Sequence, residues 1–361
     1  MNERLPQIST TEFNSFAEPI PQNSEMIPRD AELYMTKEGH IVNAEGWFHP
    51  SGRILTEIMY VPDGQGNKIL FGQNYRKVTL KPNTYAPIPY PEREEFLAEV
   101  SPDYIQSASN PFFARYKQFI PQEKLHSRFP TERALQQLLG KNDEISEGLQ
   151  KDLESMKKML VIDLDPKELG VAGSLSLGNT QSIHDFDVVF KGEAAANLTV
   201  AKKIRDLVRE YPSRRVIEGG KGWNIRFFNE YGTLMCCFFG YSNPQDAPLF
   251  QFEMDIIEEE VEVEGSVSEE RDSIYTPSIL GLQDVSLKKV RKFQANEKIQ
   301  LDKLIIYHTA TRGECFNGDY LIARGALVKV KTPNEEFFGL CAIDRDAVRN
   351  LTPNWPGYYQ F

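Results

Sequence analysis

Cysteine and histidine are scarce in this sequence, which limits the metal and redox chemistry that it can support. The 361 residues include 4 cysteines and 5 histidines. The cysteines show no Cys-x-x-Cys spacing and have no histidine at ligand spacing, which argues against a zinc motif and predicts buried, reduced thiols (Cys236, Cys237, Cys315, Cys341). The sequence also lacks a Walker loop, a dinucleotide fingerprint and the serine elbow of hydrolases, which argues against those enzyme classes.

The sequence also has fewer basic than acidic residues and no long apolar run. The chain has 41 Lys and Arg against 52 Asp and Glu, a formal net charge of −11. Generic binding of nucleic acid needs dense basic charge, so we expect none. The apolar runs are far shorter than a bilayer span, and the start, MNERLPQISTTEF, has no basic end followed by an apolar core. We therefore expect no membrane partner, no secretory signal and a cytoplasmic location.

What the sequence does contain is helical periodicity in two stretches. The first predicts an amphipathic helix, because spacings of four, four, three and four separate its apolar residues (Ile145, Leu149, Leu153, Met156, Leu160). The second predicts a helix between Gly192 and Pro212. Asp165 and Pro166 resemble a helix cap and first helical position, which predicts a single helical turn.

The flanking segments have the composition of short strands. In the first flank, DGQGN at 63–67 predicts a hairpin turn. The acidic tract Glu258–Glu264 predicts a solvated edge strand. The length favours two or three domains. We expect a loosely ordered segment at 1–37, a β-rich module and connector at 38–125, a core at 126–265 and a C-terminal β-rich module at 266–361.

The most informative stretch is GVAGSLSLGNTQSIHDFDVVF, residues 170–190. Asp185 and Asp187 lead into an apolar run that is typical of a strand, and on a strand residues i and i+2 point to one face. Two carboxylates side by side are costly to bury without a cation. Mg²⁺ or Mn²⁺, which prefer carboxylate and phosphate oxygens, would satisfy both acids.

Phosphate-binding candidates lie on either side of this strand. Gly173 and Ser174 form a glycine turn before a helical segment, where backbone N–H groups and a hydroxyl suit a triphosphate. Further along, SRRVIEGGKGWNIRF contains Lys221. This loop would bring Lys221 to a triphosphate, or it is a glycine-rich hairpin with solvated basic residues.

Gly173, Ser174, Gly178, Asp185 and Asp187 together resemble the signature of the DNA polymerase beta-like nucleotidyltransferase superfamily. The resemblance implies an α+β fold, with a polymerase-beta-like core of mixed sheet and helices flanked by N- and C-terminal β-rich modules. It also implies a third metal-binding carboxylate on a later strand. The stretch FQFEMDII offers Asp255 for that role, with Glu253 in reserve. The flanks are similar to parts of a family of predicted nucleotidyltransferases known largely from archaeal genomes.

The resemblance implies transfer of a nucleoside monophosphate from an NTP to an acceptor hydroxyl, with release of pyrophosphate. Asp185, Asp187 and Asp255 would hold two Mg²⁺ ions, while Gly173, Ser174 and Lys221 would hold the triphosphate. The acceptor is open: a small molecule, a protein or an RNA. The alternative is a non-catalytic protein that binds a nucleotide or a partner on a degenerate scaffold of this kind.

Overall fold

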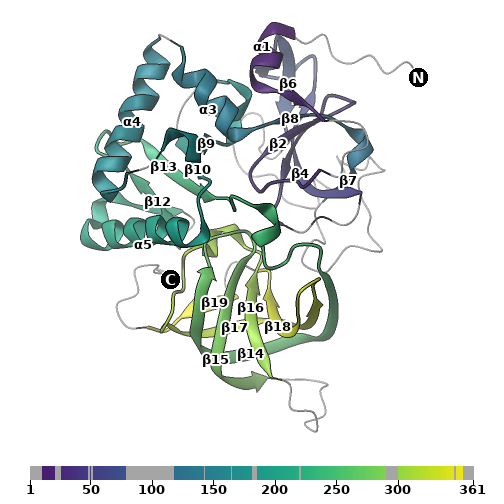
Figure 1. Cartoon of the computed structure of the whole chain (residues 1–361), viewed down its shortest axis with the longest axis vertical. Helices are drawn as coiled ribbons and strands as arrows, with labels where there is room; N and C mark the ends of the chain where they lie inside the picture. The colour runs from purple at the N-terminus through teal and green to yellow at the C-terminus, as the bar shows by residue number, and fades with distance from the viewer. Residues whose placement is uncertain are drawn as a thin grey trace. The chain divides into compact units, whose positions relative to one another are not determined.

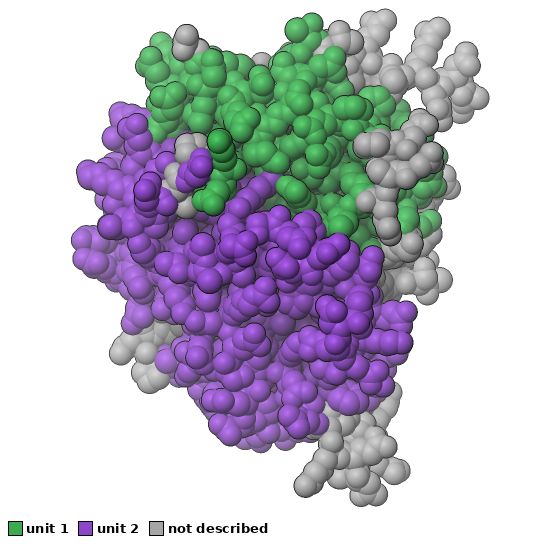
Figure 2. Space-filling model, in the orientation of Figure 1, with its two compact units in different colours: residues 1–150, 166–183 green, residues 151–165, 184–361 purple. Residues whose placement is uncertain are grey.

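The computed structural model describes residues 10–20, 26–47, 49, 52–78, 118–141, 143–163, 165–180, 185–218, 221–289, 300–344 and 347–352 (Figure 1). The chain divides into two compact units, which Figure 2 distinguishes by colour. Unit 1 comprises Met1–Gln150 and Pro166–Ile183, and unit 2 comprises Lys151–Asp165 and His184–Phe361.

Unit 1 contains an eight-stranded antiparallel sheet with the order β1-β8-β2-β3-β4-β6-β5, and β7 pairs with β4. Its strands are β1 (Glu18–Pro19), β2 (Leu33–Thr36), β3 (Ile41–Ala44), β4 (Arg53–Pro62), β5 (Lys68–Leu70), β6 (Gln73–Lys77), β7 (Gln118–Pro121) and β8 (Leu125–Phe129). Fully buried apolar residues of neighbouring strands, such as Tyr34, Val42 and Ile54, form its core. This burial is the main force that holds the sheet together.

Helices complete unit 1: α1 (Thr10–Phe16), α3 (Thr131–Leu139) and the first turns of α4 (Glu144–Leu160). Unit 1 also contains short 3₁₀ helices and a further strand: η3 (Gln122–Lys124), η4 (Pro166–Glu168), β9 (Leu169–Val171) and η5 (Gly173–Leu177). Helix α3 packs on β9. The approach is close, since a Cβ on Gly170 would lie 2.4 Å from Thr131 Oγ1.

Unit 2 begins with a layer of strands and one long helix. The strands run in the order β11-β12-β13-β10, with β10 parallel to β13 and β12 antiparallel to it. The elements are β10 (Asp185–Phe190), α5 (Ala194–Glu210), η6 (Pro212–Arg214), β11 (Arg215–Glu218), β12 (Lys221–Phe228), β13 (Leu234–Phe239) and η7 (Pro244–Asp246). Helix α5 buries an apolar face that includes Val200, Ile204 and Val208, and it packs against β12.

The second part of unit 2 is a closed sheet. Its path is β14-β15-β16-β18-β17-β19, and an additional β14–β17 pairing joins the path into a ring. The elements are β14 (Glu253–Asp272), β15 (Ser278–Lys289), β16 (Leu301–Ile306), η8 (Thr309–Thr311), β17 (Tyr320–Lys331), β18 (Glu336–Ala342) and β19 (Val348–Asn350). Closure leaves fewer unpaired strand edges. The interior is filled by apolar side chains such as Val263, Leu304 and Leu340.

The predicted fold class is wrong. The protein is mostly β, with 45% strand against 25% helix, four helices among the described residues and three sheets. It is a β-rich α+β fold rather than a compact helix–sheet polymerase-beta core. The physical reason is that the Gly-Ser and Asp-x-Asp pattern covers a turn and one strand of 6 residues, Asp185–Phe190. Such a pattern does not determine the number of strands in the rest of the chain.

None of the helices in the described part of the chain is long and apolar enough to cross a membrane. The four-part division of the chain inferred from composition stays a prediction.

Candidate functional site

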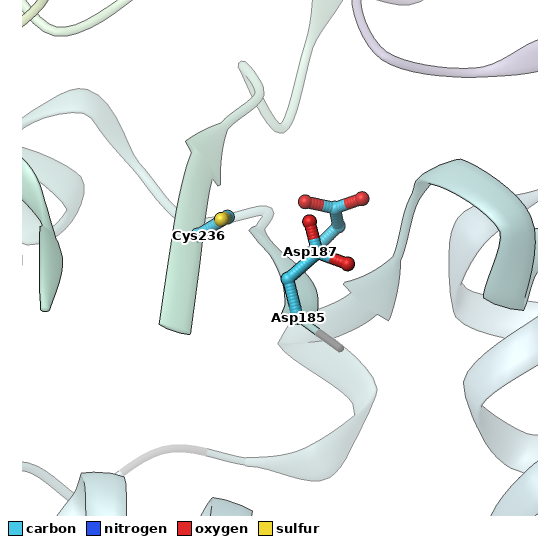
Figure 3. A group of neighbouring side chains, drawn as sticks. All are labelled: Asp185, Asp187 and Cys236. Atoms are coloured by element: carbon cyan, nitrogen blue, oxygen red, sulfur yellow. The ribbon is translucent and has the colours of Figure 1, made fainter. Parts of the chain in front are cut away.

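Asp185 and Asp187 lie on the same face of β10, as their spacing predicts. The strand alternates regularly at its start: Asp185 and Asp187 are partly exposed, while Phe186 and Val188 are buried. Figure 3 shows the two carboxylates extending to one side of the strand. The local sequence explains this arrangement, because strand alternation sends the apolar residues to the core and the acids to the opposite face.

Cys236 of the neighbouring strand β13 completes a group of side chains that could hold a metal ion. Register places Cys236 next to Asp187 across the parallel β10–β13 pairing. Its Sγ, one carboxylate oxygen of Asp185 and one of Asp187 all lie within 4.8 Å of one another. Figure 3 shows the thiol on the same side as the two acids.

The three ligand atoms are not equivalent as metal ligands. Burial, and next the charge of Asp187, raise the pKa of the Cys236 thiol to about 12, so it is uncharged at neutral pH. Carboxylate oxygens are the ligands that Mg²⁺ and Mn²⁺ prefer, whereas these ions bind sulfur poorly. Asp185 and Asp187 are therefore suitable ligands for a hard divalent ion, whereas Cys236 would lie near the ion without binding it.

Arg226 of β12 is the cationic residue beside this group. Register places it opposite Cys236 in the antiparallel β12–β13 pairing, and its Nε donates a hydrogen bond of 3.0 Å to Cys236 Sγ. Burial opposes the charge of Arg226, but Cys236, Glu218 and Asp187 raise its pKa. Asp187 and Arg226 thus interact electrostatically, while the oxygens of the two carboxylates are the ligand type that suits a divalent cation.

The expected third carboxylate does not belong to this group. Asp255 and Glu253 lie at the start of β14, where both are exposed and pair with β17, Asp255 opposite Lys329. Neither joins Asp185, Asp187 and Cys236 in the group of ligand atoms. The assignment of Asp255 as a metal ligand stays a prediction.

The residues expected to hold the triphosphate are distributed over both units. Gly173, with a φ of 60°, and Ser174 open η5, a 3₁₀ helix of 5 residues in unit 1. A positive φ favours glycine, so the turn requires Gly173. Lys221 is the first residue of β12 in unit 2 and pairs with Glu218. Their roles toward a phosphate group stay predictions.

Sequence reasoning missed Cys236 and Arg226. Each is an ordinary strand residue in the sequence, Cys236 in GTLMCCFFGY and Arg226 in NIRFFNEY. Strand register brings these two residues to Asp187. The register cannot be inferred from the sequence until it is known which strands pair.

In comparisons with known proteins, no family model, no curated protein and no solved structure matches this chain. The function must therefore be argued from the chemistry of the site itself.

Proposed function

We propose that this protein transfers a nucleoside monophosphate from an NTP to an acceptor hydroxyl, releasing pyrophosphate, in a reaction that depends on Mg²⁺ or Mn²⁺. One observation carries the proposal: the carboxylates of Asp185 and Asp187 share one strand face and approach each other within 4.8 Å. The proposal rests on this pair and its charge, and it takes no support from fold class.

Asp185 and Asp187 would hold the divalent ion, which when bound neutralises charge that develops on phosphate oxygens. The remaining steps belong to side chains of this chain. A carboxylate of the pair would accept the proton of the attacking hydroxyl, and the partial exposure of both groups to solvent supports this role. Gly173, Ser174 and Lys221 are the candidates for contacts with the triphosphate, and Asp255 is the candidate third acid.

The test is a transfer assay on the purified full chain. The protein is incubated with each α-labelled NTP and Mg²⁺ or Mn²⁺, with cell extract as the source of acceptors, and labelled product and pyrophosphate are measured. For Asp187→Asn we expect transfer to fall by about 10³-fold or more, because metal-assisted charge neutralisation is worth several kcal/mol. The melting temperature should not fall, since the change is nearly isosteric and removes one of two like charges.

Asp302→Asn is the matched control. Asp302 lies on β16 and accepts a hydrogen bond of 2.8 Å from the exposed Gln300 side chain. The Asp302→Asn substitution should leave the rate of transfer unchanged. If Asp187→Asn retains near wild-type transfer or unfolds the protein, the aspartates are structural and the proposal fails.

A second candidate is a non-catalytic protein that binds a nucleotide or a partner. Two observations favour it: Arg226 already supplies a positive charge beside the acids, and Asp255 is outside the ligand group. Equilibrium binding separates the candidates. A protein that binds NTP and metal but releases no pyrophosphate with any acceptor preparation supports the non-catalytic function.

A further inference from the structure

Arg226, Cys236 and Asp187 form a row across three adjacent strands. The β12–β13 register sets Arg226 opposite Cys236, and the β10–β13 register sets Cys236 beside Asp187. The hydrogen bond of 3.0 Å from Arg226 Nε to Cys236 Sγ shows that the guanidinium lies on the same face as this thiol. That face is the one where the thiol meets both carboxylates, as Figure 3 shows.

The contacts of Arg226 orient its guanidinium without burying it in a closed ion pair. Its Nη1 donates to Glu218 Oε2 at 2.8 Å, but 64% of the Glu218 side chain is exposed. An ion pair whose carboxylate is exposed to water contributes little to stability. The guanidinium carbon also lies 4.5 Å from the centre of the Trp223 ring, a cation–π contact that helps to hold the group in place.

We infer that Arg226 is the anion-binding residue of this site, and that its guanidinium binds phosphate oxygens of the nucleotide whose divalent ion Asp185 and Asp187 hold. The inference rests on the proposed function. Its chemistry is that of a planar guanidinium, which is always charged and offers paired N–H donors that match phosphate oxygens. The partner is therefore a polyphosphate, bound partly by an ion and partly by Arg226.

The same guanidinium has a different role before the ligands bind. Without a metal ion, Arg226 is a positive charge on the same strand face as Asp187, because register places Cys236 between the two residues. A metal ion and Arg226 therefore compete for the negative charge of the aspartates, while metal-bound triphosphate and Arg226 attract each other. Removal of the guanidinium should then weaken the binding of metal-bound triphosphate without weakening the binding of the metal ion alone.

The experiment measures both affinities by calorimetry on the full chain. The probes are Mn²⁺ alone, and a non-hydrolysable ATP analogue in the presence of saturating Mn²⁺. For Arg226→Gln we expect Mn²⁺ alone to bind as tightly as in the wild type or more tightly. The analogue should bind about 10- to 100-fold more weakly, the usual effect of losing charge-assisted hydrogen bonds.

Two further variants control for charge and for folding. Arg226→Lys keeps the charge and loses the planar fork, so its analogue affinity should lie between wild type and Arg226→Gln. Arg324→Gln removes an arginine that is 72% exposed and paired with Glu262, and it should change neither affinity. Melting temperatures of all variants report folding, and Arg226→Lys tests the inference if Arg226→Gln is unstable.

The outcomes separate this inference from the proposed function. If wild type binds Mn²⁺ and analogue, but Arg226→Gln and Arg226→Lys bind the analogue as tightly as wild type, the inference is wrong and the metal site stands. If Arg226→Gln weakens Mn²⁺ and analogue binding equally, Arg226 is structural and the inference is also wrong. If wild type binds no Mn²⁺ at all, the proposed function itself fails.

Discussion

At the scale of single residues, the properties of the aspartate pair depend on the neighbouring side chains. Asp187 has a buried apolar strand neighbour on each side and the buried Cys236 across the ladder. Its negative charge raises the pKa of Arg226. Burial of the strand neighbours thus fixes the position of the carboxylate, and Arg226 is a charged group that interacts with it.

Asp272 is a second acid whose surroundings determine its behaviour. It is 6% exposed, and its Oδ1 accepts a hydrogen bond of 2.7 Å from the Tyr241 hydroxyl. Burial raises its pKa, against the opposing effects of that hydrogen bond and of Arg271. The folded state therefore prefers the protonated acid more strongly than the unfolded state does.

The sign of the pH dependence follows from linkage. A raised pKa stabilises the fold below the ordinary aspartate pKa, and this contribution is lost as pH rises through the raised value. Asp272→Asn keeps an acceptor for Tyr241 and cannot ionise. We expect the variant to be more stable than wild type at pH 7 and above, with the difference shrinking as pH falls toward 4. Urea midpoints measured from pH 4 to 8 test this, and a constant difference between the two proteins would contradict it.

At the scale of elements, helix α5 is fastened to its neighbours by one buried side chain. The Asn197 amide nitrogen, with two N–H donors, lies within hydrogen-bond distance of three acceptors: Gly192 O at 3.1 Å, Gly240 O at 3.0 Å and the Tyr275 hydroxyl at 3.1 Å. Its Oδ1 accepts from the Gly192 amide at 3.2 Å. Asn197 is 2% exposed. One residue thus joins the start of α5 to the ends of β10 and β13 and to the turn that precedes β15.

Asn197→Ala should destabilise unit 2 by about 2–3 kcal/mol, because it leaves buried backbone and hydroxyl groups without partners. Thr199→Ala is the control, since its hydroxyl bonds only to Ala195 O within the exposed side of the same helix. It should cost less than about 0.5 kcal/mol. Denaturant unfolding of both variants measures the difference. Equal effects of the two substitutions would show that Asn197 does not fasten the helix.

The elements with the strongest periodicity were predictable from the sequence. The apolar spacing from Ile145 to Leu160 predicts helix α4, Glu144–Leu160, and the stretch before Pro212 predicts α5, which ends at Glu210. The Asp185–Phe190 strand and the single turn at Pro166–Glu168 are confirmed as well. In each case local spacing or a cap decides the structure, so distant contacts are not needed to infer it.

Strand pairing was less predictable, because it depends on contacts that local sequence does not specify. DGQGN does form a turn, with Gly66 N bonded to Asp63 O at 2.8 Å. The strands on its two sides do not form the expected hairpin, since β4 pairs with β6 and β5 pairs with β6 on the other edge. The acidic tract is a strand, as predicted, but it is not an edge strand along its whole length. Glu262–Ser266 pairs with β15 on one side and with β17 on the other.

At the scale of the whole molecule, the short Gly-Ser and Asp-x-Asp motif could not predict the fold class. The carboxylate pair and its strand follow from a few residues, whereas the β-rich character follows from long strands such as β14, with 20 residues, and from their ring closure. Closure requires β14 to pair with β17, more than 50 positions away in places, such as Glu253 with Lys331. The cytoplasmic location expected from the sequence stays a prediction.

The cysteines give a measurable property of the whole of unit 2. All four are reduced, outside any disulfide, and are buried, with exposures of 2% for Cys236, 1% for Cys237, 2% for Cys315 and 0% for Cys341. They are distributed over β13, the segment between η8 and β17, and β18. Burial also raises the pKa of Cys236, Cys237 and Cys341, so these thiols are both inaccessible and protonated at neutral pH.

The thiolate is the reactive form, so a thiol reagent should reach these cysteines only when unit 2 opens. In native buffer at pH 8 we expect no rapid reaction with a disulfide reagent such as DTNB, and in denaturant we expect all 4 thiols to react. The reaction should appear over a range of denaturant concentration in which the far-ultraviolet circular dichroism of the chain is also lost. A reducing agent should leave the melting temperature unchanged, because no cysteine is in a disulfide. A thiol that reacts within seconds in native buffer would show that part of the core of unit 2 is open to solvent, contrary to the packing described above.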